Sequence, residues 1–344
     1  MKAIRIHQHG GPEKLKLEEV PNPTCGTHDV MVQLKAASLN HLDIWVRKGI
    51  PGWVIPLPLI PGSDGAGVVV GKGEAIKDLT SGDRVLIVPN VSCGVCNYCL
   101  DGSDNFCNEY GIVGEHCNGC DAEYIVMPRR NVIPVPKFLS FEEAAAIPLV
   151  FMTAWHMLVT KAQIKPEQLV LVLGASGGVG SAAIQIARLH GAQVIAVAGD
   201  ETKLEKARAL GAEHCINYKK ESISKRAKEI SEGRGVDVVV EHVGKATWDE
   251  SLKSLAKGGK IVICGATSGY DVSLDLRYLF MKHQQIIGST MATRGELFEI
   301  MNFVRQKKLK AVIDKTFPLA SAAEAHQYLE SGKQFGKVVL TIGS

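Results

Sequence analysis

The spacing of apolar residues divides the chain into two regions of different character. In the first region, short apolar segments at residues 2–7, 29–36, 67–71 and 84–88 are separated by turns and by a proline-rich stretch at residues 51–61. Segments of this length between turn residues predict short β-strands. We therefore expect an irregular all-β domain at the beginning of the chain.

After about Ala144 the pattern changes to a regular alternation of strands and helices. Repeated βαβ units predict a parallel sheet with helices on both faces. The predicted strands are residues 168–173, 193–198, 215–218, 236–241 and 260–264, and the predicted helices are residues 179–190, 201–210, 222–231 and 247–256. The tail, residues 311–344, predicts two strands around a helix at residues 321–331, and periodicity leaves open which domain it joins.

Length and composition favour a two-domain enzyme with a small-molecule partner. The 344 residues are 46% hydrophobic and 22% charged, a balance that allows a well-buried interior. The net charge is +3 and the basic residues are dispersed, so neither nucleic acid nor a membrane is an expected partner. Residues 144–160 are uncharged but too short to span a bilayer, and we expect a buried helix there. The first residues do not resemble a signal peptide.

Four cysteines, Cys93, Cys96, Cys99 and Cys107, lie close together in a predicted loop at residues 90–110. Clustered thiolates at these spacings select a tetrahedral zinc ion. Four thiolates close the zinc shell, so we predict one structural Zn²⁺ per subunit that holds the loop and takes no part in catalysis. The remaining cysteines show no disulfide framework, which favours a reducing cytoplasm.

A glycine-rich loop follows the apolar strand at residues 168–173. Residues 174–180 read GASGGVG and lead directly into an Ala- and Ile-rich helix. Small residues let the backbone approach a pyrophosphate, which the helix N-terminus then stabilises. We predict a dinucleotide site here, against the alternative of an ordinary tight turn. The predicted contacts are Ala175, Ser176, Gly177, Gly178 and Val179.

The end of the next strand indicates which dinucleotide is preferred. An NAD site usually places an acidic residue there, whereas this chain has Ala198 and Gly199. Lys203, one helical turn later, could reach a 2′-phosphate, so we predict NADP(H), with NAD(H) as the alternative. Lys203 could instead be a solvated helix residue, and Asp200 or Glu201 would repel a phosphate if either pointed inward.

Several motifs occur in a specific order: PGSDGAG at residues 61–67, GDRV at 82–85, the cysteine cluster, AEY at 122–124 and the glycine loop. Together they resemble the medium-chain dehydrogenase/reductase superfamily, which includes the zinc-containing alcohol dehydrogenases. The resemblance implies an α/β fold with a GroES-like β-rich catalytic domain plus a Rossmann domain with a doubly wound parallel sheet. The implied catalytic domain is residues 1–145 and 291–344, and the implied NAD(P)-binding domain is residues 146–290.

The positions that match the catalytic zinc ligands of that superfamily are Asn40, Ser63 and Leu149, none of which is a good zinc ligand. Leu42 also replaces the hydroxyl residue that relays the alcohol proton. Without a Lewis acid the site is poorly suited to alcohol oxidation near neutral pH. Reduction of an activated double bond needs only hydrogen-bond donors and a proton for the resulting enolate.

The chain resembles the quinone oxidoreductase and enoyl reductase branch, in which an Asn at the position of Asn40 is common. We therefore predict an NADPH-dependent reductase of enones, enals, quinones or enoyl thioesters, with Asn40 contacting the substrate carbonyl or else serving as a structural amide. The predicted catalytic group is Asn40, Asp43, Ser63 and Asp64. One alternative is an alcohol dehydrogenase with a nonstandard metal site made of Asp43, Asp64 and His41. Another is a cofactor- or RNA-binding protein without turnover.

The resemblance implies further cofactor contacts. His41 and Lys337 would contact the pyrophosphate, or else lie on the surface. Thr153 would pack beside the nicotinamide, and Tyr218 would contact the adenosine phosphate end or pack at a strand end. The remaining implied positions are Val243, Gly265, Ala266 and Met291. The resemblance also implies a homodimer formed through sheet edges near residues 268–276, or a homotetramer.

Where relatives generally have two glycines and an aromatic residue before the AEY motif, this chain has Gly119, Cys120 and Asp121. We interpret Cys117 and Cys120, which lie near His116, as ordinary thiols at the rim of the active site. Metal or redox chemistry is the alternative. Trp45 and Trp53 could line a substrate pocket or belong to the core.

Overall fold

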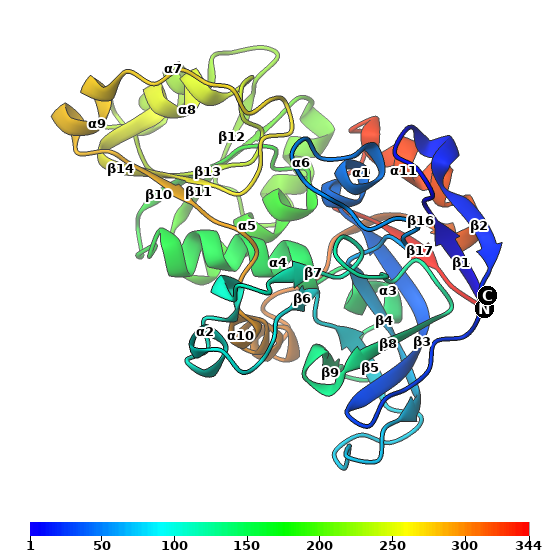
Figure 1. Ribbon diagram of the computed structural model, residues 1–344. Coiled ribbons are helices and arrows are strands. Elements are labelled where there is room, and N and C mark those ends of the chain that lie inside the picture. Colours follow the sequence, from blue (N-terminus) through cyan, green and yellow to red (C-terminus); the bar gives the residue numbers. More distant parts are fainter. Residues whose placement is uncertain (344) are drawn as a thin grey trace. The chain divides into compact units, whose positions relative to one another are not determined.

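The computed structural model describes residues 1–343, which form two compact units (Figure 1). Unit 1 consists of Met1–Val150, Thr293–Met301 and Lys310–Ser344, and unit 2 consists of Phe151–Ala292 and Asn302–Leu309. The domain boundaries expected from the sequence, after residues 145 and 290, lie close to the breaks at Val150 and Ala292. The short segment Asn302–Leu309, which belongs to unit 2, was expected in the catalytic domain.

Unit 1 is built around a mainly antiparallel sheet that the first region and the tail share. Its strand order is β16-β17-β3-β4-β5-β9, and β8 also pairs with β3. The strands are β3 (Asp29–Leu39), β4 (Asp64–Lys72), β5 (Arg84–Ile87), β8 (Tyr124–Pro128), β9 (Val132–Pro134), β16 (Ile313–Pro318) and β17 (Lys337–Thr341). Two small sheets pair β1 (Lys2–Arg5) with β2 (Lys16–Glu19) and β6 (Asn90–Val91) with β7 (Gly111–Ile112).

The tail completes unit 1, as the family resemblance implied. Strand β17 runs antiparallel to β3, with Val338 opposite Leu39 and Leu340 opposite Ala37, and β16 lies parallel to β17. Helix α11 (Ala322–Glu330) connects these two tail strands. Because Lys337 begins β17 and Asn40 directly follows β3, this register places both residues at one end of the strand pair.

A short helix, α1 (His41–Lys48), begins directly after β3 and was not predicted. Its Arg47 is fully buried and donates to Gly10 O at 3.2 Å and to Glu330 Oε1 at 2.9 Å. Arg47 Nη1 also lies 3.2 Å from His326 Nδ1. Burial lowers the pKa of His326 to about 3, so its ring is neutral and accepts from the guanidinium. These bonds fasten α1, and with it Asn40, to α11.

The other helical segments of unit 1 are short. They are α2 (Asn97–Leu100), α3 (Phe141–Ala145), η1 (Pro12–Lys14), η2 (Asp104–Phe106), η3 (Arg129–Asn131) and η5 (Leu319–Ser321). Helix α3 begins with a capping box, in which Ser140 and Glu143 each bond the other's backbone N–H. The core of unit 1 consists of the inward-facing Val, Ile and Leu side chains of its strands, such as Val32, Leu34 and Leu340.

Unit 2 contains the predicted parallel sheet. Its strand order, β12-β11-β10-β13-β14-β15, is that of a doubly wound dinucleotide-binding fold, whose order reverses between β10 and β13. The strands are β10 (Leu169–Val172), β11 (Gln193–Ala198), β12 (His214–Asn217), β13 (Val236–Glu241), β14 (Leu255–Ile263) and β15 (Gln285–Gly288). Helices cover the sheet on both sides, with α7 and α8 above it and α5 below it in Figure 1. This arrangement confirms the expected fold class.

The helices of unit 2 follow the predicted alternation. They are α5 (Gly178–Leu189), α6 (Glu201–Ala209), α7 (Ile223–Ile230), α8 (Trp248–Ser254) and α9 (Leu276–Lys282). The prediction for α8 ran two residues too far at its C-terminal end, because β14 already begins at Leu255. Strand β15, helix α9 and helix α10 (Arg294–Arg305) were not predicted. The signal for α10 was present in the sequence, because its buried apolar residues recur at helical spacing: Leu297, Ile300, Met301 and Val304.

The uncharged stretch at residues 144–160 includes α4 (Pro148–Trp155), which continues as a π-helical segment, η4 (His156–Lys161). Proline suits the first turn of a helix because it has no N–H to leave unpaired. Almost all of these side chains are buried, which confirms the expected buried helix. Across residues 1–343, no helix combines the length and hydropathy that crossing a membrane requires.

Candidate functional site

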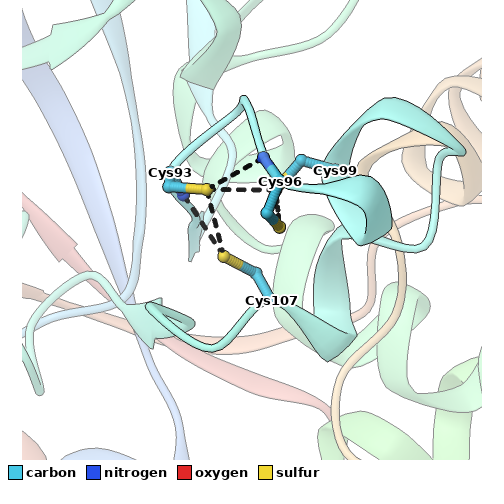
Figure 2. A group of neighbouring side chains, drawn as sticks. All are labelled: Cys93, Cys96, Cys99 and Cys107. Carbon is cyan, nitrogen blue, oxygen red and sulfur yellow. Dashed lines mark hydrogen bonds between the residues drawn. The ribbon is translucent and has the colours of Figure 1, made fainter.

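The four predicted zinc ligands converge on one point of unit 1 (Figure 2), and their sulfur atoms all lie within 4.8 Å of one another. The Sγ atoms of Cys93 and Cys107 are 3.5 Å apart, those of Cys96 and Cys99 3.6 Å, and those of Cys93 and Cys99 3.9 Å. Zn–S bonds of about 2.3 Å in a tetrahedron place sulfurs about 3.8 Å apart. The cluster therefore has the dimensions of a Cys₄ zinc site.

Backbone N–H groups surround these sulfurs. Cys96 N donates to Cys93 Sγ at 3.4 Å, Gly94 N to Cys99 Sγ at 3.3 Å, and Glu109 N to Cys107 Sγ at 3.4 Å. The backbone N–H groups of Val95 and Cys96 lower the pKa of Cys93 to about 6. A thiolate is the form that binds zinc, so the loop backbone favours the state in which the metal is held.

Few other contacts hold the cysteine loop. It leaves β6 and returns to β7, which pair only through Asn90 with Ile112 and Val91 with Gly111. Val95 is 76% exposed and Leu100 73%, so the loop has little apolar core of its own. The fit of the sulfurs and the sparse packing both indicate that a zinc ion would be the principal support of this loop.

A second, buried polar cluster lies where β17, β3 and β4 meet. The ammonium of Lys337 donates to Asn40 Oδ1 and, at 3.2 Å, to Asp64 Oδ2. Asn40 Nδ2 donates to the same Asp64 oxygen at 2.9 Å. The other oxygen of Asp64 accepts the Leu149 N–H at 2.9 Å. The cluster thus joins a cation, an amide and a carboxylate from three distant parts of the sequence.

Asp43 and Ser63, the other two predicted catalytic residues, are also fully buried. Asp43 Oδ2 accepts the Asn40 backbone N–H at 2.6 Å. Asp43 Oδ1 and Ser63 Oγ have no hydrogen-bond partner in the described chain. Burial raises the pKa of Asp43 and lowers that of Lys337, and the carboxylates of Asp64 and Asp43 partly offset the effect on Lys337.

The structure sharpens three residue predictions. Asn40 uses both amide hydrogens within unit 1, one on Asp64 and one on Ser38 O at 3.3 Å, as a structural amide would. Lys337 is buried and not a surface residue. His41 is exposed at the start of α1, and the centroid of its ring lies 5.0 Å from that of the Trp45 ring in an edge-on arrangement. Contacts of Lys337 and His41 with a pyrophosphate stay predictions.

The alternative metal site of Asp43, Asp64 and His41 finds no support in the geometry. Within residues 1–343, the cysteine cluster is the only set of three or more His, Cys, Asp or Glu side chains near enough to share a metal ion. Cys117 and Cys120 do not join such a set. Burial raises the pKa of both thiols, which keeps them protonated, as ordinary buried cysteines are.

In unit 2 the glycine loop has the form that a pyrophosphate requires. Gly177 is the N-cap residue of α5. Because glycine has no side chain, no side-chain oxygen accepts a hydrogen bond from the first N–H groups of the helix. Gly174 has a φ of +52°, and a Cβ on Gly180 would lie 2.7 Å from Ala175 Cα. The loop follows β10, at the point where the strand order reverses, which is where this fold binds dinucleotides.

The end of β11 contains no carboxylate directed at a ribose. A Cβ on Gly199 would lie 2.7 Å from Tyr218 Oη, so the tyrosine occupies the space of a side chain there. Asp200 caps α6, accepting the Lys203 N–H at 2.9 Å. Glu201 accepts from Lys220 at 2.8 Å. Both acids that could repel a 2′-phosphate therefore have other partners.

The predicted nicotinamide contacts of unit 2 also come together in pairs. Thr153 Oγ1 donates to Met291 Sδ at 3.8 Å, and Met291 is left-handed, with a φ of +50°. The loops after β13 and β14 are joined where Ser268 N donates to Val243 O at 2.7 Å. Ala266, in the loop after β14, packs against the loop after β13, since a Cβ on Gly244 would lie 3.0 Å from Ala266 Cα.

Sequence reasoning missed Glu241, a buried carboxylate at the end of β13. It accepts the N–H groups of Val243 and Gly244 at 2.8 and 2.9 Å and the hydroxyls of Thr247 and Ser251. It therefore shapes the loop that carries Val243. The signal was present in the sequence, because an acidic residue that ends a buried apolar strand needs such partners.

Comparison with known proteins places these features in a family. Residues 26–137 match the alcohol dehydrogenase GroES-like domain, and residues 178–306 match the zinc-binding dehydrogenase family. A solved structure of an NAD-dependent alcohol dehydrogenase is 48% identical over the full length of both chains, with a TM-score of 0.97.

Two curated relatives carry other activities in their names. A crotonyl-CoA carboxylase/reductase from Cereibacter sphaeroides is 33% identical, over 94% of this chain and 83% of its own. A quinone oxidoreductase from Rattus norvegicus is 30% identical, over 99% of this chain and 98% of its own. This agreement along the whole chain confirms the family resemblance: the protein is an oxidoreductase that belongs to the zinc-type, alcohol dehydrogenase-like medium-chain dehydrogenase/reductase superfamily.

Proposed function

We propose that the protein is an NADPH-dependent reductase that adds hydride to an activated double bond without a catalytic zinc ion. The cluster of Asn40, Asp64 and Lys337 carries this proposal. At the position matched to a zinc-binding cysteine, the chain places an amide bonded to a buried ammonium. Relatives named quinone oxidoreductase and crotonyl-CoA carboxylase/reductase support the same class of reaction. The substrate would be an enone, enal, quinone or enoyl thioester.

The residues of unit 1 supply what such a reaction requires at the carbonyl. NADPH, when bound, supplies the hydride. Asn40 would turn one amide hydrogen toward the substrate oxygen, and the long 3.3 Å bond to Ser38 O is the one it can exchange. The Lys337 ammonium bonded to Asn40 Oδ1 polarises the amide and strengthens its N–H as a donor. The fixed positive charge also favours negative charge on the oxygen.

Replacing Asn40 with Ala is expected to lower kcat/KM about 100- to 1000-fold, the usual effect of removing one donor from a developing oxyanion. The measurement is NADPH oxidation across a panel of enones, enals, quinones and enoyl thioesters. Asn302→Ala, which changes an exposed amide on α10, serves as the control and should leave the rate unchanged. An unchanged rate in the Asn40 variant would support the structural-amide interpretation.

Alcohol oxidation remains the second candidate, because a structure 48% identical is that of an NAD-dependent alcohol dehydrogenase. The zinc content per subunit separates the two functions. One zinc ion per subunit, together with activity that survives incubation with a chelator, agrees with the reductase. Two equivalents, with alcohol oxidation lost on chelation, would replace the first proposal with the second.

We propose, further, that two copies associate through the β15 edge of unit 2. Strand β15 ends the sheet, and helix α9 beside it has no buried residue. Leu276 and Phe280 lie one helical turn apart on α9 and are 65% and 66% exposed. Met281, next to Phe280, is 65% exposed. Apolar side chains grouped in this way commonly mark a protein interface. A homodimer or a homotetramer would cover them.

Phe280→Glu is expected to shift the protein from dimer or tetramer toward smaller species, because it places a charge within the apolar surface of α9. Light scattering coupled to size-exclusion chromatography measures the mass. Leu17→Glu, at an exposed apolar residue of β2 in unit 1, is the matched control and should leave the mass unchanged. A native protein that runs as a monomer at micromolar concentration would contradict the proposal.

A further inference from the structure

His242 is a half-buried histidine of unit 2 that the reaction proposed above does not use. It directly follows β13, and its Nε2 lies 2.8 Å from the carbonyl oxygen of Leu173, which directly follows β10. The two strands are neighbours, and Leu173 N donates to Val240 O at 3.3 Å, so their carboxyl ends lie together. The strand order of the sheet reverses between them. His242 therefore lies where a doubly wound sheet binds its dinucleotide.

The ring of His242 lies against the glycine loop. A Cβ on Gly174 would stand 2.7 Å from His242 Cε1, 3.1 Å from Nε2 and 3.7 Å from Nδ1. Gly174 has a φ of +52°, and its carbonyl oxygen accepts the Gly177 N–H at 2.9 Å, which closes the turn before α5. A side chain at position 174 would displace the ring. The glycine that shapes the loop thus also makes room for the histidine.

The bond to Leu173 determines which ring nitrogen of His242 carries the hydrogen. A carbonyl oxygen only accepts, so Nε2 is the donor. Burial lowers the pKa of His242, which favours the neutral ring near pH 7. In a neutral ring with a hydrogen on Nε2, Nδ1 is an acceptor. Nδ1 makes no hydrogen bond within residues 1–343, and it is not one of the unpartnered atoms that are sealed from solvent.

The order of the strands indicates which part of the cofactor this acceptor meets. Strand β11, whose end at Gly199 is the expected place of the adenosine ribose, lies on one side of β10, and β13 lies on the other. The glycine loop after β10 would hold the pyrophosphate between them. The nicotinamide half of the dinucleotide then continues toward β13. Its ribose follows the pyrophosphate directly, and ribose hydroxyls are hydrogen-bond donors.

We propose that His242 is a cofactor-binding residue, whose Nδ1 accepts a hydrogen bond from a hydroxyl of the nicotinamide-side ribose. The inference rests on the part of the proposed function that names a nicotinamide dinucleotide as cofactor. It holds for NADPH and NADH alike, because the two differ only at the other ribose. The imidazole would then act in two directions, with Nε2 fastened to the end of β10 and Nδ1 holding the ribose. A ribose held in this way orients the nicotinamide ring that it carries.

Two amide variants separate the roles of the two ring nitrogens. His242→Gln places its amide nitrogen at the position of Nε2, so it keeps a donor for Leu173 O but has no acceptor at the position of Nδ1. His242→Asn places an oxygen at the position of Nδ1 but is too short to reach Leu173 O. Isothermal titration calorimetry without substrate measures Kd for NADPH, NADH, ADP-ribose and ADP. ADP-ribose has the second ribose without the nicotinamide, and ADP lacks both.

His242→Gln is expected to raise Kd for NADPH, NADH and ADP-ribose about 3- to 10-fold, the usual effect of losing one hydrogen bond between neutral groups. Its Kd for ADP should not change. His242→Asn should bind all four ligands within about twofold of the native protein. Without ligand, the urea midpoint of the Gln variant should match that of the native protein, and that of the Asn variant should be lower. His28→Gln, at an exposed histidine of unit 1, is the control and should match the native protein throughout.

The opposite order of the two variants, with native binding by His242→Gln and weak binding by His242→Asn, would assign the histidine to the Leu173 bond alone and overturn the proposal. A loss of ADP binding as large as that of ADP-ribose would overturn it as well, because it would show a distorted glycine loop. Weaker binding of NADH with unchanged binding of ADP-ribose would contradict the ribose contact. The expected Kd ratios in a protein that reduces no enone, enal, quinone or enoyl thioester would uphold the contact while the proposed function fails.

Discussion

Cys96→Ser is expected to empty the zinc site and to lower the free energy of unfolding by about 5 kcal/mol. Structural zinc contributes about 10 kcal/mol or more to the folding of isolated peptides, and here it supports a loop and not a whole domain. We expect a large loss of stability because the loop is poorly packed: Val95 and Leu100 are largely exposed, and only two residue pairs join β6 to β7. Without the metal, little would hold the three remaining cysteine side chains of the cluster together.

The measurement combines zinc content with urea unfolding and limited proteolysis. The native protein should hold one zinc per subunit, and Cys96→Ser should hold none and should be cleaved within residues 92–110. Because four thiolates leave no open coordination position, kcat of the protein that remains folded should change little. Cys25→Ser changes a cysteine outside the cluster and should match the native protein. Retention of one zinc ion by the Cys96 variant would contradict the assignment of the ligand set.

Lys203→Ala is expected to raise KM for NADPH about 10- to 100-fold while leaving KM for NADH nearly unchanged. A hydrogen bond to a charged group contributes about 1.5 to 3 kcal/mol, and each 1.4 kcal/mol corresponds to a factor of ten. The 2′-phosphate is the group that distinguishes the two cofactors. Lys203 is the first basic residue after β11. Of the two acids before it, Glu201 is held by Lys220, whereas Asp200 accepts the Lys203 N–H and lies 4.0 Å from its ammonium, which a 2′-phosphate would have to attract away.

Steady-state kinetics with each cofactor give the ratio of KM for NADPH to KM for NADH in the native protein and in the variant. Lys206→Ala removes an exposed charge from the same helix, so it controls for the general electrostatic effect of losing a lysine. A fall in affinity for both cofactors alike would assign Lys203 to a nonspecific role. A native protein that prefers NADH would show that the lack of an acidic side chain at Gly199 does not select NADPH.

Much of the fold could be predicted because its signals are local. Strand and helix periods in residues 168–264 identified five of the six strands of the parallel sheet, and the spacing from Cys93 to Cys107 identified the cluster of cysteines. Strand β15 and helices α9 and α10 escaped prediction. The apolar residues of α9 are exposed, so they do not follow the pattern of a helix that buries one face.

The candidate site was predictable as a set of residues but not as a set of contacts. Asn40, Asp64 and Lys337 were each singled out, yet the bond from Lys337 to Asn40 joins residues 297 positions apart. No local pattern specifies it, because it depends on the register of β17 against β3. The same holds for the burial of Asp121, which the sequence marked only as an unusual residue.

The sequence by itself determined the parallel-sheet unit, the cysteine cluster and the glycine loop, because each depends on spacing within a few residues of chain. Only the tertiary structure decided that the tail completes unit 1, that Lys337 turns inward to Asn40 and that Asp121 is buried against Gly62. Those outcomes depend on strand pairing and burial between distant segments. Burial also determines which acids keep a proton, since the cost of a charge depends on the groups that fold around it.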